Sequence, residues 1–159
     1  MTHPTTVHET LIFERSFECS VPILWNAFAD AEARARWGVP SPTAVIHYNE
    51  TDFRIGGRDV SRCGSRDDPR YLVEAIYLDI KPSQRIVYSE AVKDGDISLS
   101  GSLHTVEMFQ DGARTSLKIT IQVASYDDAG MVQGVRQGMS AALDNLAKSV
   151  LVEETIAGA

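Results

Sequence analysis

The chain has 159 residues, of which 43% are hydrophobic and 23% charged, and its formal net charge is -7. This length fits one domain with a sizeable core, and the composition is typical of a globular protein. An acidic chain without a basic run repels phosphate backbones, so we expect no nucleic-acid partner.

Residues that mark disulfides, metal sites or membrane segments are sparse. Cys19 and Cys63 stand in no CxxC or Cys/His ligand spacing, so we expect two reduced thiols in a soluble, cytoplasmic protein. The four histidines are scattered, which predicts no metal site, and we assign no cofactor. No apolar run approaches the ~20 residues of a membrane span, and the first residues lack the pattern of a secretion signal.

The first predicted elements are a strand and two short helices. Residues 7–19 alternate between apolar and polar side chains, which is typical of a strand. Ser20 and Asp30 are N-cap residues that predict helix starts, and the second helix covers residues 31–37. Gly38 ends this helix.

The middle of the chain, from residue 43 to residue 122, reads as strands separated by turn residues. Asp111 and Gly112, for example, form a dipeptide that favours a tight hairpin turn. Successive hairpins of this kind predict an antiparallel meander. We expect its strands at residues 45–48, 58–63, 71–80, 85–92, 97–109 and 114–123.

The last part of the chain predicts one long helix that begins after Asp127 and Asp128 and runs to about Val152. Its apolar residues recur every three or four positions, as the buried face of a helix requires. We therefore expect an α+β fold in which a curved antiparallel sheet of about six or seven strands wraps around this helix. The domain covers residues 7–152, and residues 1–6 and 153–159 are expected to be flexible termini.

A spaced signature occupies the first third of the chain. It begins with VPILW at residues 21–25, continues with WGVP at 37–40 and ends with DFRIGG at 52–57. In this spacing the chain resembles the START-like (SRPBCC) superfamily, and within it the bacterial homologues of the C-terminal domain of the activator of the 90-kDa heat-shock chaperone ATPase. The resemblance spans residues 11–151 and implies a helix-grip fold with a hollow between the sheet and the C-terminal helix.

This resemblance implies that the protein binds a small hydrophobic ligand, lipid-like or aromatic, in that internal cavity. Two alternatives stay open: a chaperone-activator-like protein-interaction module with a role in stress response, and an enzyme similar to polyketide cyclases or dehydratases. The sequence lacks the motifs GxSxG, GxGxxG, HExxH and the phosphate loop, so we assign no catalytic residue and favour a protein that is not an enzyme. A homodimer is also left open.

The parity of each strand predicts which side chains face the cavity. In residues 71–80 the more apolar set is Leu72, Glu74, Ile76 and Leu78, so we expect this set to point inward. Glu74 and His104 are then polar groups on apolar faces. They are either satisfied core or strand-end residues, or a pair that orients a ligand and, in the enzyme hypothesis, serves as acid and base.

Two further features leave a structural and a functional interpretation open. Asp52 pins the turn at residues 56–57 through an ion pair with Arg54 or Arg58, or Arg58 clamps a ligand carboxylate. Gly134 and Gly138 lie on one row of the long helix, where each glycine costs up to ~1 kcal/mol. Either a neighbouring element packs closely there, or the row makes space for a cavity or a partner.

The candidate cavity residues are Trp37, Tyr48, Arg58, Glu74, Ile76, Tyr88, His104, Met108, Gly134, Gly138 and Met139.

Overall fold

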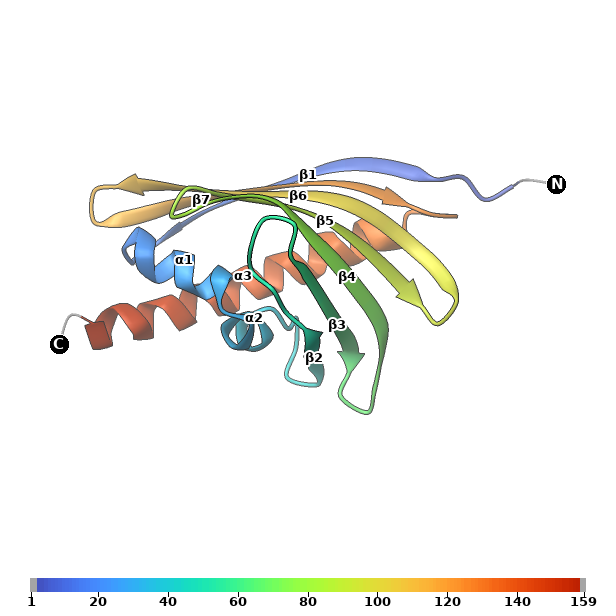
Figure 1. Cartoon of the computed structure of the whole chain (residues 1–159), viewed down its shortest axis with the longest axis horizontal. Coiled ribbons are helices and arrows are strands. Elements are labelled where there is room, and N and C mark those ends of the chain that lie inside the picture. Colours follow the sequence, from blue (N-terminus) through green and yellow to red (C-terminus); the bar gives the residue numbers. More distant parts are fainter. Residues whose placement is uncertain (1–2, 158–159) are drawn as a thin grey trace.

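A seven-stranded antiparallel sheet forms the body of the molecule, and one long helix lies along its concave face (Figure 1). The structure, a computed structural model, describes residues 3–157. The strands are β1 (Val7–Phe17), β2 (Ala44–Glu50), β3 (Arg58–Ser65), β4 (Asp68–Lys81), β5 (Arg85–Asp94), β6 (Ile97–Asp111) and β7 (Arg114–Ser125). The helices are α1 (Val21–Ala29), α2 (Ala31–Trp37) and α3 (Gly130–Ala157).

The sheet has the order β1-β7-β6-β5-β4-β3-β2. It is a meander of hairpins from β2 to β7, and β1 pairs with the last strand. Gly112, at the turn between β6 and β7, has a φ of 61°, which favours glycine in this turn. The predicted α+β helix-grip fold is therefore confirmed, including the two short helices after the first strand.

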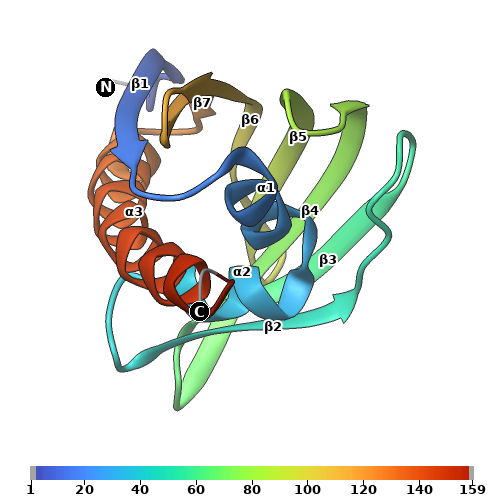
Figure 2. The same cartoon turned by 90° about the vertical axis from the view of Figure 1, so that its left-hand side faces the viewer.

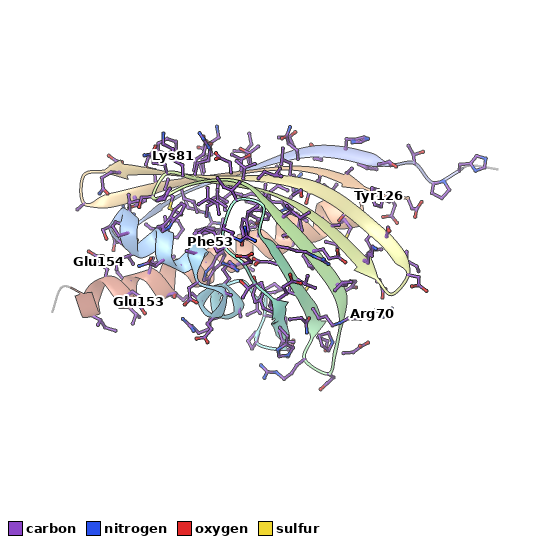
Figure 3. The ribbon with its side chains drawn as sticks, viewed as in Figure 1. Phe53, Arg70, Lys81, Tyr126, Glu153 and Glu154 are labelled. Carbon is purple, nitrogen blue, oxygen red and sulfur yellow. The ribbon has the colours of Figure 1, made fainter. Side chains whose placement is uncertain are left out.

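One boundary differs from the sequence prediction. The C-terminal helix was expected to end near residue 152, but α3 continues to Ala157. Glu154 lies in this extension (Figure 3), and its carboxylate accepts a hydrogen bond from the backbone N–H of Ser20 at 3.3 Å. This contact joins the end of α3 to the start of α1. Residues 1–2 and 158–159 of the expected flexible termini lie outside the described residues.

The sheet curls from β1 round to β2, and α1 and α2 lie in the opening that it leaves beside α3 (Figure 2). Bulges bend the sheet, because an extra residue in one strand kinks that strand and increases its twist. The extra residue is Leu78 on β4, between Tyr77 and Asp79, and Leu99 on β6, between Ser98 and Ser100. The strands β4 and β6, on either side of β5, therefore each carry a bend.

The inner face of β4 is the opposite of the one predicted. Ala75 and Tyr77 are buried, whereas Ile76 and Leu78 are 46% and 51% exposed on the convex face. The prediction was wrong because it assumed that the more apolar set faces inward. The inner face at this strand is partly polar, since the Tyr77 hydroxyl donates a hydrogen bond to the buried carboxylate of Asp59.

The apolar core lies between α3, α1 and the strands β1, β6 and β7. Leu24 of α1 and Leu143 and Leu146 of α3 are fully buried, and they belong to the same cluster as Ile119 and Ile121 of β7. The apolar periodicity of the C-terminal segment therefore identified the buried face of α3. The helix packs along one side of the curved sheet and leaves the strands β2 to β5 to be covered by α2.

The glycine row of α3 is not explained by close packing. A Cβ atom added at Gly134 or Gly138 would meet nothing within 4 Å, apart from the helix's own nearby backbone. This open space argues against a closely packed neighbour and against the wall of the internal cavity, and the third alternative, space for a partner, stays a prediction.

Replacing Gly134 or Gly138 with alanine should stabilise the protein by ~0.5–1 kcal/mol each, because alanine restricts the unfolded chain and the added methyl group fits. Urea unfolding of the two single variants measures the change in the free energy of unfolding. Gly112→Ala is the control: a Cβ there also meets nothing within 4 Å, but the positive φ makes alanine destabilising. A loss of stability in the helix variants would contradict the open environment.

Candidate functional site

A cavity of about 90 Å³ lies inside the curve of the sheet, beneath α2. Its wall combines aromatic rings with a few polar groups. The rings are those of Phe28, Trp37, Tyr48, Phe53, Tyr77 and Tyr88. The charged and hydroxyl groups are those of Arg34, Asp59, Ser61 and Glu90, besides the tyrosine hydroxyls.

A buried ion pair connects α2 to the sheet at one side of this cavity. Arg34 Nη2 lies 2.9 Å from Asp59 Oδ2, and the two side chains are only 12% and 8% exposed. The other guanidinium donors are also used, because Nη1 bonds to the carbonyl of Phe28 at 2.6 Å and Nε to the Tyr48 hydroxyl at 3.2 Å. The guanidinium is thus held on three sides by α1, β2 and β3.

Both carboxylate oxygens of Asp59 also have hydrogen-bond partners. Its Oδ2 also accepts a hydrogen bond from the Tyr77 hydroxyl at 2.5 Å, and its Oδ1 accepts one from the backbone N–H of Asp52 at 3.1 Å. Burial raises the pKa of Tyr77 above its ordinary value, and the bond to Asp59 adds to this, so the hydroxyl keeps its proton. One carboxylate therefore fixes α2, β4 and the loop before β3.

That loop places Phe53 in the wall. Figure 3 shows Phe53 between the sheet and the helices, and its ring lies 5.0 Å from that of Tyr77 in an edge-to-face arrangement. The loop turns tightly at Gly57, where a Cβ atom would overlap the carbonyl oxygen of Asp52. The paired glycines of the sequence signature thus serve to fold Phe53 and Asp52 back over the sheet.

A second polar cluster lies on β5 and β6, next to the ion pair. The imidazole of His104 stacks on the ring of Tyr88, with 4.6 Å between the ring centres and 14° between the planes. His104 Nε2 lies 2.9 Å from Ser102 Oγ and 3.7 Å from Glu90 Oε1. Its Nδ1 is buried and has no partner among the described residues.

The electrostatics of this cluster keep its rings neutral. Burial lowers the pKa of His104, and the nearby carboxylate of Glu90 only partly opposes this effect. Burial and the charge of Glu90 raise the pKa of Tyr88 well above its ordinary range. The Tyr88 hydroxyl makes no hydrogen bond with the described residues, although its ring lines the cavity. It is a donor and acceptor without a protein partner.

The cavity wall contains four of the residues that the sequence analysis selected, namely Trp37, Tyr48, Tyr88 and Met139. Trp37 is anchored by a 2.9 Å hydrogen bond from its Nε1 to the carbonyl of Ala27. His104 and Met108 are buried but lie outside the wall.

Arg58, Glu74 and Ile76 are not brought to the cavity. Arg58 and Glu74 form an ion pair of 3.1 Å whose side chains are 48% and 35% exposed, on the convex side of the sheet. The expected pairing of Glu74 with His104 is therefore wrong, because β4 presents its other face to the interior. Of the two arginines expected to pair with Asp52, Arg54 does so at 2.7 Å and Arg58 does not.

Sequence reasoning missed Arg34, Asp59, Tyr77 and Glu90. Asp59 alternates with the apolar Val60 in a predicted strand, and this pattern usually places the charged residue in solvent. Arg34 has a similar neighbour, Arg36, on the same short helix. No local pattern distinguishes the arginine that is buried from the one that is not.

The cavity offers no metal site. No group of three or more His, Cys, Asp or Glu side chains that could hold a metal ion occurs within residues 3–157. Over the same residues, none of the helices is long and apolar enough to cross a membrane.

Comparisons with known proteins support the helix-grip assignment. Residues 18–150 match the family model described as activator of Hsp90 ATPase homolog 1-like protein. The protein Mll3558 from Rhizobium loti is 35% identical in sequence, with a TM-score of 0.79 and coverage of 91% of this chain and 98% of that one. A protein from Rhizobium leguminosarum is 28% identical, with a TM-score of 0.79 and coverage of 92% and 96%. No curated protein matches the chain.

Asp59→Asn should destabilise the protein by ~3–5 kcal/mol, because it leaves the buried guanidinium of Arg34 without a counter-ion. Urea unfolding measures this loss. Glu18→Gln is the matched control, since Glu18 pairs with Arg114 at 2.8 Å on the surface, and its cost should stay below ~1 kcal/mol. Equal costs for the two variants would show that the buried pair does not hold α2.

Stability should fall as the pH drops below the ordinary histidine pKa of about 6.5, because the unfolded chain then takes up a proton that buried His104 resists. The contribution reaches at most ~1.4 kcal/mol per pH unit, the value of one proton. His104→Gln cannot titrate, so the difference in unfolding free energy between pH 7.5 and pH 5.5 should be smaller than in the parent. If His104→Gln loses as much unfolding free energy between pH 7.5 and pH 5.5 as the parent, His104 is not the source of the pH dependence.

Proposed function

The chain belongs to the family described as activator of Hsp90 ATPase homolog 1-like proteins, and we propose that it binds a small, compact ligand in the cavity beneath α2. One observation carries this proposal. Six aromatic rings wall the cavity, while the hydroxyls of Tyr88 and Ser61 in that wall make no hydrogen bond with the described residues. Ligand pockets combine apolar walls with a few unpaired polar groups in this way.

The size of the cavity favours a compact ligand over a lipid chain. An apolar cavity of ~150 Å³ holds one benzene molecule, so a volume of about 90 Å³ suits a molecule with few non-hydrogen atoms. Of the two ligand types expected from the sequence, the aromatic or similarly compact one fits the observed volume better. A long acyl chain would need the wall to move.

The wall is organised before a ligand arrives. The ion pair of Arg34 and Asp59 fixes α2 over the cavity, and Tyr77 is locked by the same carboxylate. A binding site that is already ordered loses less conformational entropy when the ligand binds. The free hydroxyls of Tyr88 and Ser61 then supply the polar contacts that orient the ligand.

The two other hypotheses gain no support from the site. The enzyme hypothesis depended on Glu74 and His104 as an acid–base pair, and these residues lie on opposite faces of the sheet. The family description names activation of the Hsp90 ATPase, and the cavity itself is no evidence for that partner. Measuring the ATPase rate of the chaperone with and without the protein tests this alternative directly.

Filling the cavity should abolish ligand binding. Ala75 is buried in the wall, so Ala75→Leu occupies most of the free volume, whereas Ala91→Leu adds the same atoms on the exposed side of β5. Amide chemical shifts are followed by NMR during titration with phenol, benzyl alcohol and toluene. We expect shifts at Tyr77 and Tyr88 in the parent and in Ala91→Leu, and a loss of affinity of ~10-fold or more in Ala75→Leu.

Two outcomes would contradict the proposed function. One is that none of the compounds shifts the resonances of cavity residues in the parent. The other is that Ala75→Leu binds as well as Ala91→Leu, which would place the binding elsewhere on the protein.

A further inference from the structure

We propose that the ligand of this cavity is a small organic cation, held by Glu90 and the faces of the surrounding tyrosine rings. This inference rests on the proposed function and specifies its ligand class. It starts from Glu90, whose side chain is 24% exposed and lines the cavity. Its carboxylate makes no hydrogen bond with the described residues.

The charges around the cavity leave Glu90 without compensation. Arg34 and Asp59 neutralise each other at 2.9 Å. His104 is the nearest basic group at 3.7 Å, but its burial lowers its pKa and so favours the neutral imidazole. Among the described residues that line the cavity, no other charged group faces Glu90. A carboxylate in partly dry surroundings without a counter-ion attracts a cation.

An anion would find no such partner. The guanidinium of Arg34 is the one basic group among the described lining residues, and its Nε, Nη1 and Nη2 are already bonded to Tyr48, Phe28 and Asp59. An anionic ligand would have to break one of these bonds and would face the charge of Glu90. The cavity therefore selects its ligand by the sign of the charge and not only by the size of the molecule.

The aromatic wall suits a cation as well. The faces of aromatic rings carry negative potential, and clusters of them recognise quaternary ammonium groups. Phe53 and Tyr77 meet at 79°, and Tyr77 and Tyr88 at 66°, with 5.0 Å and 5.9 Å between the ring centres. Rings that meet nearly at right angles point their faces in different directions around one space, so several can contact a compact, rounded cation.

Tetramethylammonium is the probe that tests this inference, with tert-butyl alcohol as a neutral molecule of similar shape and acetate as an anion. Each is titrated into the parent protein at constant ionic strength while the amide shifts of residues 75, 77, 88 and 90 are followed. The parent should bind tetramethylammonium ~10-fold or more tightly than tert-butyl alcohol, and acetate more weakly than either.

Glu90→Gln should remove the preference for the cation and bring the affinities for tetramethylammonium and tert-butyl alcohol within ~2-fold of each other. Glu74→Gln is the matched control, because it removes one carboxylate from the other face of the sheet, and it should keep the preference of the parent. The comparison of cation with neutral molecule in the parent needs no variant, so it decides the question even if Glu90→Gln does not fold.

The outcomes separate this inference from the proposed function. If phenol or toluene binds in the cavity but tetramethylammonium binds no better than tert-butyl alcohol, the cation inference fails and the cavity function stands. If the folded Glu90→Gln variant prefers tetramethylammonium over tert-butyl alcohol as strongly as the parent does, the role of Glu90 is overturned. If no compound perturbs the cavity residues, both proposals fail.

Discussion

The structure depends on a buried ion pair between Arg34 of α2 and Asp59 of β3. A buried charge is tolerated only where its partners are complete, because removing one of them leaves the other charge in a medium that does not solvate it. Here the partners come from α1, β2, β4 and the loop before β3. All of these segments must reach their final positions before the pair is satisfied, so the pair fixes the geometry of one half of the molecule.

This constraint divides the interior into two parts. On one side, α1 and α3 pack against β1, β6 and β7 through a dry core that includes Leu24, Leu143 and Ile121. On the other side, α2 lies against β2 (Figure 2), and the inner face of β2 to β5 carries tyrosines and charged groups around a cavity. The dry half stabilises the fold through burial of apolar area, and the polar half encloses the cavity.

The sequence predicted the fold far better than the site. The fold follows from patterns among neighbouring residues, whereas the site depends on contacts between residues far apart in the sequence. The turn at Gly112 and the periodicity of α3 depend on neighbouring residues, so both were correctly predicted. Trp37, Tyr48, Tyr88 and Met139 were among the predicted cavity residues, and they do line the wall. Asp59 was missed because its partner lies 25 positions away, on a helix where nothing distinguishes Arg34 from Arg36.

The inner face of β4 was wrongly predicted for a related reason, because it too depends on contacts with distant residues. The rule that the more apolar side of a strand faces inward holds where the interior is a dry core. It fails at Ile76 and Tyr77, where the interior is a polar cavity and the tyrosine hydroxyl is satisfied by Asp59. The neighbouring strand β3 shows the same reversal, since Asp59 and Ser61 are buried while Val60 is only half-buried.

Unsatisfied polar groups are concentrated beside a single ring, that of Tyr88. An unpaired buried polar atom costs ~1–3 kcal/mol, and native proteins keep few of them. Among the described residues His104 Nδ1 is the buried side-chain atom of this kind, and His104 stacks on Tyr88. Glu90, two positions from Tyr88, and the Tyr88 hydroxyl also make no hydrogen bond with the described residues, but the Glu90 side chain is 24% exposed and does not carry this cost in full. The ion pair nearby is fully satisfied, so the same region of the fold holds one complete hydrogen-bond network and, beside it, groups that the described residues leave unpaired.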